Sequence, residues 1–225
     1  MTTPAVTTPA ADTRPRVVLV AAVLVALIVG LCGGVLFASR LLQQPALPGD
    51  ASLEAGFARD MQAHHGQAVE MALLIRQRST DPAIQQLALD IVLTQQQQQG
   101  QMYGWLSSWG LQQSSSREPM AWMSQDNGGG HTMTEDAGQA AMPGMATDEQ
   151  IARLTAADDV EAERVFLELM TRHHQGGVQM AEAAVDQTSR AEVQRLAKAI
   201  ITSQTAEITV LQDLLEARGG PPTDL

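Results

Sequence analysis

Two pairs of adjacent histidines carry the most distinctive chemistry of this sequence, and each pair follows a methionine by three residues. The first pair is His64-His65 after Met61, and the second is His173-His174 after Met170. Imidazole nitrogens and thioether sulfurs form a soft donor set, which suits copper, Cu(I) before Cu(II), better than Ca2+, Mg2+ or Mn2+. The predicted metal ligands are Met61, His64, His65, Met71, Met170, His173, His174 and Met180.

Helical geometry places these histidines in or beside an apolar stripe. At about 100° per residue, His64 shares one face with Phe57 and Ile75, whereas His65 lies further round the helix. Burying an imidazole costs free energy unless it is hydrogen-bonded or binds a ligand. Core histidines with polar partners are therefore the alternative, and the duplication favours metal ligands. Adjacent residues on a helix face different directions, so a single site that uses all four histidines is the harder arrangement.

Polar side chains interrupt the apolar stripes near these histidines and on the helices expected to pack against them. A carboxylate or amide that faces an imidazole can orient it and strengthen it as a ligand. Solvated positions at the edge of the stripe are the alternative interpretation. The candidates for this supporting role are Asp60, Gln95, Gln98, Gln204 and Glu207.

A second group of soft donors lies between the two histidine pairs. Residues 114–146 are rich in Gly, Ser and Met and lack a helical period, so we expect a Met-rich loop on the protein surface. Exposed methionines there would suit auxiliary capture of a soft ion, and a loop that covers a groove with methionine is the alternative. The candidate residues are Met120, Met123, His131, Met133, Met142 and Met145.

An internal repeat indicates which elements position these residues. A shift of 109 residues superposes residues 54–109 on residues 163–218 without a gap, and both histidine pairs coincide. Each unit is predicted to be a helical hairpin. One hairpin cannot bury its own apolar stripe well, so the two should pack as a ferritin-like four-helix bundle over residues 51–218. The predicted fold is all-α.

Local signals predict where several helices begin. Asp81-Pro82 provides a good N-cap followed by a residue that suits the first helical position. Capping boxes are predicted at Thr147 with Gln150, before a short helix, and at Ser189 with Glu192, before the last helix.

An apolar segment precedes the repeats. Residues 17–38 carry no charge and match the length of about 20 residues that crosses a bilayer. Secretory signals have shorter apolar regions, of about 7–15 residues, so a retained signal anchor is favoured over a cleaved signal. We expect a single-pass protein of the cytoplasmic or inner membrane with its C-terminal domain extracytoplasmic. The predicted organisation is a disordered cytoplasmic tail (1–16), a transmembrane anchor (17–38), a linker (39–50), the bundle (51–218) and a tail (219–225).

Composition narrows the classes of function. Among 225 residues, 44% are hydrophobic and only 3% aromatic, which favours a helical core. The net charge of -11 excludes a general basic nucleic-acid binder. Cys32 is the only cysteine, which excludes an internal disulfide framework and a Cys-rich zinc site. Small residues recur every fourth position from Ala26 to Ala38, a spacing that lets two membrane helices pack closely in a homo-oligomer or with an envelope partner.

Residues 166–181, FLELMTRHHQGGVQMA, contain a Met-x-x-His-His-Gln-Gly signature, and residues 61–71, MQAHHGQAVEM, are a looser copy. The signature resembles that of the domain of unknown function 305 (DUF305) family, over about residues 51–217. The resemblance implies a ferritin-like four-helix protein, secreted or membrane-anchored in bacteria. It also implies extracytoplasmic copper binding and tolerance, with the Met and His residues named above as ligands. Gly66-Gln67 departs from the Gln-Gly of the signature.

We therefore expect a membrane-anchored, extracytoplasmic protein that binds copper for buffering, tolerance or delivery. A non-catalytic assembly subunit of an envelope complex is the alternative. A metalloenzyme is disfavoured, since the only candidate proton-handling groups near the repeats are Asp60, Glu70, Glu182 and Glu207. A di-iron oxidase is disfavoured as well, because its Glu-x-x-His motif is absent from both repeats.

Overall fold

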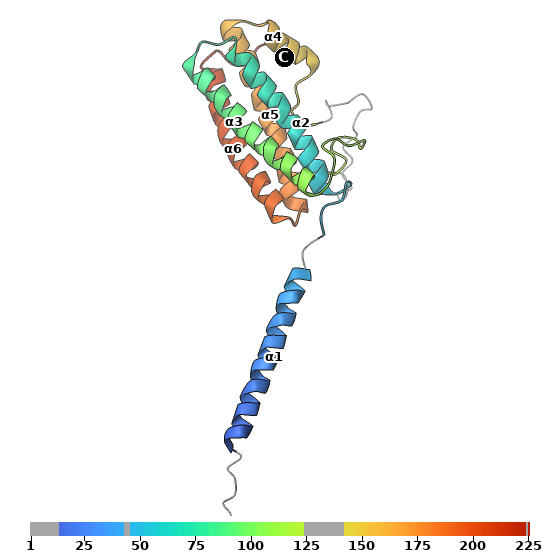
Figure 1. The fold of residues 1–225 in the computed structure, drawn as a ribbon. Coiled ribbons are helices and arrows are strands. Elements are labelled where there is room, and N and C mark those ends of the chain that lie inside the picture. Colours follow the sequence, from blue (N-terminus) through green and yellow to red (C-terminus); the bar gives the residue numbers. More distant parts are fainter. Residues whose placement is uncertain (1–13, 43–45, 124–141, 224) are drawn as a thin grey trace, which may run out of the picture. The chain divides into compact units, whose positions relative to one another are not determined.

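The computed structural model describes residues 14–42, 46–123, 142–223 and 225, and these residues form helices and connecting turns without a strand (Figure 1). The chain divides into two compact units, Met1–Leu47 and Pro48–Leu225. The helices are α1 (Arg14–Leu42), α2 (Leu53–Arg76), α3 (Pro82–Ser108), α4 (Asp148–Ala156), α5 (Asp159–Gln187) and α6 (Ala191–Glu216).

Helix α1 is the apolar element of the first unit. It extends beyond the predicted 17–38 at both ends, and its segment Ala21–Arg40 has a mean hydropathy of 2.7. At 1.5 Å per residue, about 20 helical residues span about 30 Å, which is the thickness of a hydrocarbon core. An N-terminal signal sequence can meet the same criteria of helix length and hydropathy, so the membrane anchor stays a prediction.

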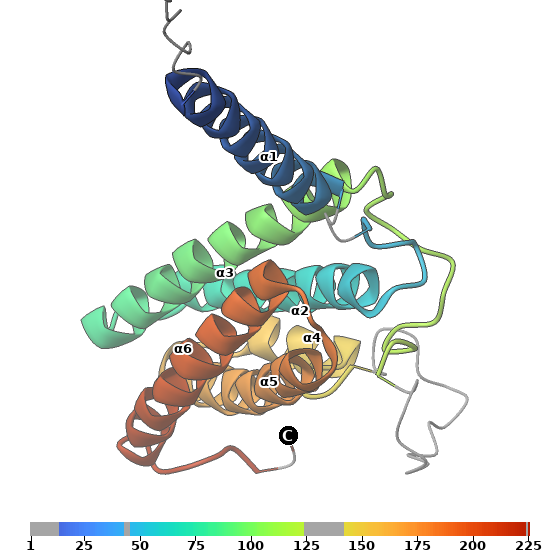
Figure 2. The ribbon, with the colours of Figure 1, turned by 90° about the horizontal axis from the view of Figure 1, so that it is seen from below.

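The second unit is built from two helical hairpins, as predicted. Helices α2 and α3 form the first hairpin, and α5 and α6 form the second. Helix α3 begins at Pro82 and α6 begins at Ala191, 109 residues later, so the repeat in the sequence is a repeat of helices. The hairpins pack together mainly through α2 and α5, while α4 lies across one end against the same two helices (Figures 1 and 2). The expected four-helix bundle is confirmed.

Two of the predicted helix starts are confirmed. The Asp81 carboxylate accepts backbone hydrogen bonds from Ala83 and Ile84 at the start of α3. Thr147 and Gln150 form the expected capping box of α4. Both motifs act through residues two or three positions apart, and for that reason the sequence alone identifies them.

The capping box predicted at the start of α6 is wrong. The N-cap position is Arg190, and no side chain caps the helix there. The box requires its two members to be the N-cap and the third helical residue. A start one residue later than expected removes Ser189 from the first of these positions and Glu192 from the second. Glu192 instead pairs with Arg190 at 3.3 Å.

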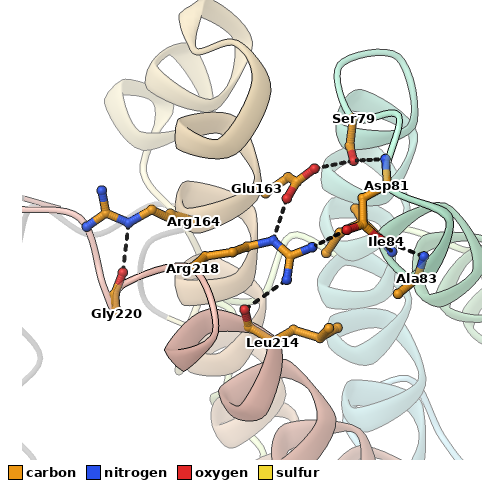
Figure 3. Close-up of polar contacts among 9 residues, drawn as sticks. All are labelled: Ser79, Asp81, Ala83, Ile84, Glu163, Arg164, Leu214, Arg218 and Gly220. Atoms are coloured by element: carbon orange, nitrogen blue, oxygen red, sulfur yellow. Dashed lines mark hydrogen bonds and ion pairs between the residues drawn. The ribbon is translucent and has the colours of Figure 1, made fainter.

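An ion network joins the two hairpins at one end of the bundle (Figure 3). The guanidinium of Arg218, just after α6, donates to Glu163 of α5 and to Asp81 at the start of α3. The Ser79 hydroxyl also donates to the buried Glu163 carboxylate. These contacts fix the end of one hairpin against the turn of the other, and so constrain how α3 and α6 stand around the core.

Candidate metal centre

A layer of polar side chains crosses the middle of the bundle. Along α2, buried apolar side chains between Ala55 and Met61 are followed by His64 and His65 and then by buried apolar side chains between Ala68 and Ile75. Each of the other three long helices is interrupted in the same way, so the layer separates two hydrophobic core clusters. We call these residues the polar layer: His64, His65, Gln95, Gln98, His173, His174, Gln204 and Glu207.

The central members of the layer are His64 and His173, one from each repeat. Their ring centroids lie 3.8 Å apart, with 35° between the ring planes. The outer histidines stand further away: the His65 ring is 6.5 Å from that of His64, and the His174 ring is 6.4 Å from that of His173. All four side chains are completely buried. The arrangement is thus one facing pair with one outer histidine in each hairpin.

Three of these histidines use the same ring nitrogen for a hydrogen bond. Nε2 of His65 lies 2.6 Å from the Gln98 amide oxygen, and Nε2 of His174 lies 2.6 Å from the Glu207 carboxylate. Nε2 of His64 lies 3.0 Å from the backbone carbonyl of Pro143. Carbonyl and carboxylate oxygens only accept hydrogen bonds, so Nε2 carries a proton in each case, and in a neutral ring Nδ1 then keeps its lone pair.

The layer concentrates unpaired polar atoms. Ten buried side-chain nitrogen and oxygen atoms of the described residues have no hydrogen-bond partner, and nine of them lie in the layer. A buried polar group without a partner costs about 1–3 kcal/mol, so the layer opposes folding unless something satisfies it. The nine atoms are Nδ1 of His64, His65, His173 and His174, Nε2 of His173, and both amide atoms of Gln95 and Gln204.

Burial keeps the imidazoles of His64, His65 and His173 neutral. It lowers the pKa of His64 from the ordinary 6.5 to about 4 and that of His65 to about 3. Burial also lowers the pKa of His173 well below 6.5, and the neighbouring His64 adds to this shift. A metal must compete with protons for a histidine nitrogen, and near neutral pH no proton occupies these lone pairs.

The four methionines predicted as ligands are fully buried on either side of the layer. Met61 and Met180 belong to one core cluster, and Met71 and Met170 belong to the other. The helical repeat places Met61 and Met170 one turn before the central histidines, on the same face. The structure therefore gathers one methionine from each repeat on each side of the polar layer.

Asp60 does not face a histidine in this structure. Its carboxylate accepts hydrogen bonds of 2.8 Å from the backbone N–H of Met120 and from the indole N–H of Trp122. Burial raises the pKa of the Asp60 carboxyl, and these two hydrogen bonds oppose the rise. Asp60 thus holds the chain that follows α3 against α2, a contact that helical periodicity cannot predict.

The expected exposure of the Met-rich loop is wrong for the part that the structure describes. Met120 and Met142 are only 2% and 3% exposed, and Met123 and Met145 pack partly buried against the same core cluster. These side chains cover the bundle, because hydrogen bonds to Asp60 and Gln67 hold Met120 and Ala146 on α2 and Pro143 lies against Gly176 of α5. His131 and Met133 lie outside the described residues.

Sequence analysis missed the carbonyl of Pro143 as a partner of the site. The available signal was the glycine pair at 176–177, inside a helix, where glycine costs about 1 kcal/mol relative to alanine and marks a close approach. Gly176 lies against Pro143, and Gly177 leaves room for the side chains of Gln204 and His64.

The donor set decides which ions the layer fits. The part of the chain that the structure describes contains no group of three or more His, Cys, Asp or Glu side chains placed to hold a metal. Imidazole nitrogens with thioethers on both sides of the layer fit a soft ion.

Comparison with known proteins places the chain in a family. None of the curated proteins matches it. Among solved structures, a DUF305 protein from Streptomyces coelicolor is 41% identical over 79% of this chain and 100% of its own, with a TM-score of 0.69. A DUF305 fragment from Deinococcus radiodurans is 34% identical over 77% of this chain and 99% of its own, with a TM-score of 0.62.

A third similar structure is that of CopM in its Cu(I)-bound form. It is 26% identical over 73% of this chain and 96% of its own, with a TM-score of 0.53. CopM has also been solved in Cu(II)-bound, Ag-bound and apo forms. Residues 54–215 match the family described as "Domain of unknown function (DUF305)", which spans both hairpins, and the chain therefore belongs to the DUF305 family.

Proposed function

We propose that this protein binds copper as a cargo ion, Cu(I) in preference to Cu(II), at the polar layer. The observation that carries the proposal is the set of nine buried, unpaired nitrogen and oxygen atoms around the facing rings of His64 and His173. An ion that accepts the lone pairs of the imidazole nitrogens and amide oxygens among them would remove part of the desolvation cost that folding otherwise bears. The similarity to CopM, solved with Cu(I), Cu(II) and Ag, supports copper as that ligand.

The oxidation state follows from the donors and their surroundings. Imidazole and thioether ligands are neutral, and thioethers favour Cu(I). The cost of moving an ion into a low-dielectric interior rises steeply with its charge, and a monovalent ion bears less of it. We place Met61 and Met180 on one side of the ion and Met71 and Met170 on the other as its soft ligands.

The role we propose is buffering or delivery without turnover. Helix α1 would anchor the chain in the membrane, and the bundle would hold copper on the extracytoplasmic side. The enclosed layer favours storage over catalysis, because a catalytic metal needs an open coordination position for its substrate. We therefore expect a chain loaded with copper to show no oxidase or hydrolase activity.

An anaerobic competition titration with a Cu(I) chelator tests the proposal on the full chain in detergent. We compare the wild type with the double variant His64→Leu/His173→Leu and with His131→Ala. Wild type should bind tightly, and the double variant should lose at least about 100-fold in affinity. Circular dichroism and urea unfolding establish that each variant stays folded.

The remaining outcomes contradict the proposal in distinct ways. Unchanged affinity in a folded double variant would remove the polar layer from copper binding. Loss of binding in His131→Ala alone would move the site to the Met-rich loop. Absence of tight binding in the wild type would favour the alternative of an assembly subunit, which crosslinking in native membranes can detect.

A further inference from the structure

Residues 142–146 cross the bundle directly beside the polar layer. Met142 and Ala146 are buried, and Pro143 between them brings its carbonyl to 3.0 Å from Nε2 of His64. His64 belongs to α2, and the same short segment also touches α5. We call residues 142–146 the strap.

On α5, the lack of a side chain at Gly176 lets the strap lie directly against the helix. A Cβ atom added to Gly176 would overlap the carbonyl of Pro143, and one added to Gly144 would overlap the carbonyl of Arg172. Gly144 also has a φ of +76°, in the left-handed region that favours glycine. Two glycines, one on each side of the contact, therefore allow the strap backbone to lie on the helix backbone.

On α2, the side chain of Gln67 hydrogen-bonds the other end of the strap. The Gln67 amide nitrogen donates to the carbonyl of Ala146 at 2.9 Å, and its amide oxygen accepts from the backbone N–H of Ala146 at 2.7 Å. Gln67 occupies the position of repeat one that Gly176 occupies in repeat two. The order of the two residues is swapped between the repeats, Gly66-Gln67 in the first and Gln175-Gly176 in the second. The difference matches two roles, because Gln67 hydrogen-bonds the strap and Gly176 leaves space for it.

The strap has a chemical consequence for His64. A carbonyl oxygen can only accept, so the contact with Pro143 requires the proton on Nε2. In a neutral ring the other nitrogen, Nδ1, then keeps its lone pair, and Nδ1 of His64 is buried without a partner. Within the described part of the chain, His173 has no equivalent contact, and neither of its ring nitrogens has a hydrogen-bond partner.

We propose that the Pro143 carbonyl, seated on Gly176, is a positioning group that holds His64 in its Nε2–H tautomer and so selects Nδ1 as the nitrogen offered to the ion. This inference rests on the proposed function for the identity of the ion. It assigns the strap the supporting role that carbonyls and carboxylates take beside metal-bound histidines. The strap therefore acts on copper through His64 and is not itself a ligand.

The test uses the full chain in detergent, labelled with 15N at histidine. Variants alter one of the two strap contacts, either Gly176 on α5 or Gln67 on α2. Gly176→Ala displaces the Pro143 carbonyl. Gly66→Ala is the matched control, because it adds the same methyl group to α2 where the nearest side-chain atom is an ordinary 3.4 Å away. Gln67→Leu releases the other end of the strap without touching α5, and serves if Gly176→Ala does not fold.

Long-range 1H–15N spectra of the metal-free protein give the tautomer of His64, with His64→Gln assigning its signals. Wild type and Gly66→Ala should show Nε2–H alone. Gly176→Ala or Gln67→Leu should show a mixture, and Cu(I) affinity measured by competition should fall by about 10- to 100-fold.

Two outcomes would overturn the inference: Nδ1–H on His64 in the wild type, or unchanged Cu(I) affinity in a variant whose tautomer has changed. Because the tautomer is measured without metal, this result is independent of the proposed function. A wild type that shows Nε2–H and binds no Cu(I) would overturn the proposed function and, with it, the selection of a metal-binding nitrogen.

Discussion

The imidazole rings of His64 and His173 face each other across the α2–α5 interface with their centroids 3.8 Å apart. The two residues occupy equivalent positions of the repeat, 109 residues apart in the chain. Packing the two hairpins through equivalent helices therefore brings the duplicated histidines together at the centre. The contact between the two rings costs free energy in the metal-free protein, because among the described residues neither ring nitrogen of His173 has a hydrogen-bond partner of good geometry.

Replacing His173 by leucine should separate stability from metal binding. The change removes two unpaired buried nitrogens at similar volume, so the metal-free protein should gain about 1–3 kcal/mol of unfolding free energy. Cu(I) should stabilise wild type by about 3 kcal/mol at a hundredfold excess over Kd and should lose most of this effect in His173→Leu. Urea unfolding with and without Cu(I) measures both quantities. A less stable metal-free variant would mean that other contacts satisfy His173.

The buried histidines should make the metal-free protein sensitive to mild acid. The pKa of His64 is about 4 in the folded chain, against an ordinary 6.5. The unfolded state therefore binds protons first as the pH falls, and stability present above about 6.5 is lost progressively down to about 4. At 1.36 kcal/mol per pKa unit, His64 alone contributes about 3 kcal/mol to this loss.

Urea unfolding between pH 4 and 7 in the presence of a chelator measures this pH dependence. Carboxylates also titrate in this range, so the difference between wild type and His64→Leu isolates the histidine. The variant should show the shallower dependence on pH. Parallel curves for the two proteins would contradict the lowered pKa.

The buried methionines should set the preference for soft ions. Met61→Leu/Met180→Leu conserves volume, so its cost in stability should stay below about 1.5 kcal/mol per site. Binding of Cu(I) and Ag(I) should weaken by about tenfold or more, because thioethers favour Cu(I). Met102→Leu is the matched control, a fully buried methionine of the same core cluster that we do not assign to the ion. Equal losses in both variants would assign the effect to packing.

The ion network at the end of the bundle should be important for stability. Arg218→Met leaves the buried Glu163 carboxylate without its guanidinium partner, and breaking such a pair costs about 3–5 kcal/mol. Arg195→Met, on the exposed face of α6, should change stability by no more than about 0.5 kcal/mol. Urea unfolding compares them, and Arg218→Met/Glu163→Gln should recover part of the loss. Similar stability of both single variants would show that the network contributes little.

The sequence by itself determined the elements and their apolar faces. Local spacing in the sequence predicts the two hairpins, the start of α3 after Asp81 and the capping box at Thr147. Such spacing can be read without any knowledge of the tertiary structure. The same periodicity predicted that the histidines are buried, since His64 lies on the stripe of Phe57 and Ile75. It was wrong by one residue at the start of α6, where no side chain caps the helix.

Only the tertiary structure decided which groups meet. It paired His64 with His173, turned His65 towards Gln98 and His174 towards Glu207, and buried Met120 and Met142. It also placed the Pro143 carbonyl within hydrogen-bond distance of His64, which is 79 residues away in the chain. Helical periodicity predicts which face of its own helix a side chain lies on. It does not predict how far that side chain is from residues of another element. Partners across the bundle are set by how helices and strap pack, and that depends on the whole core at once.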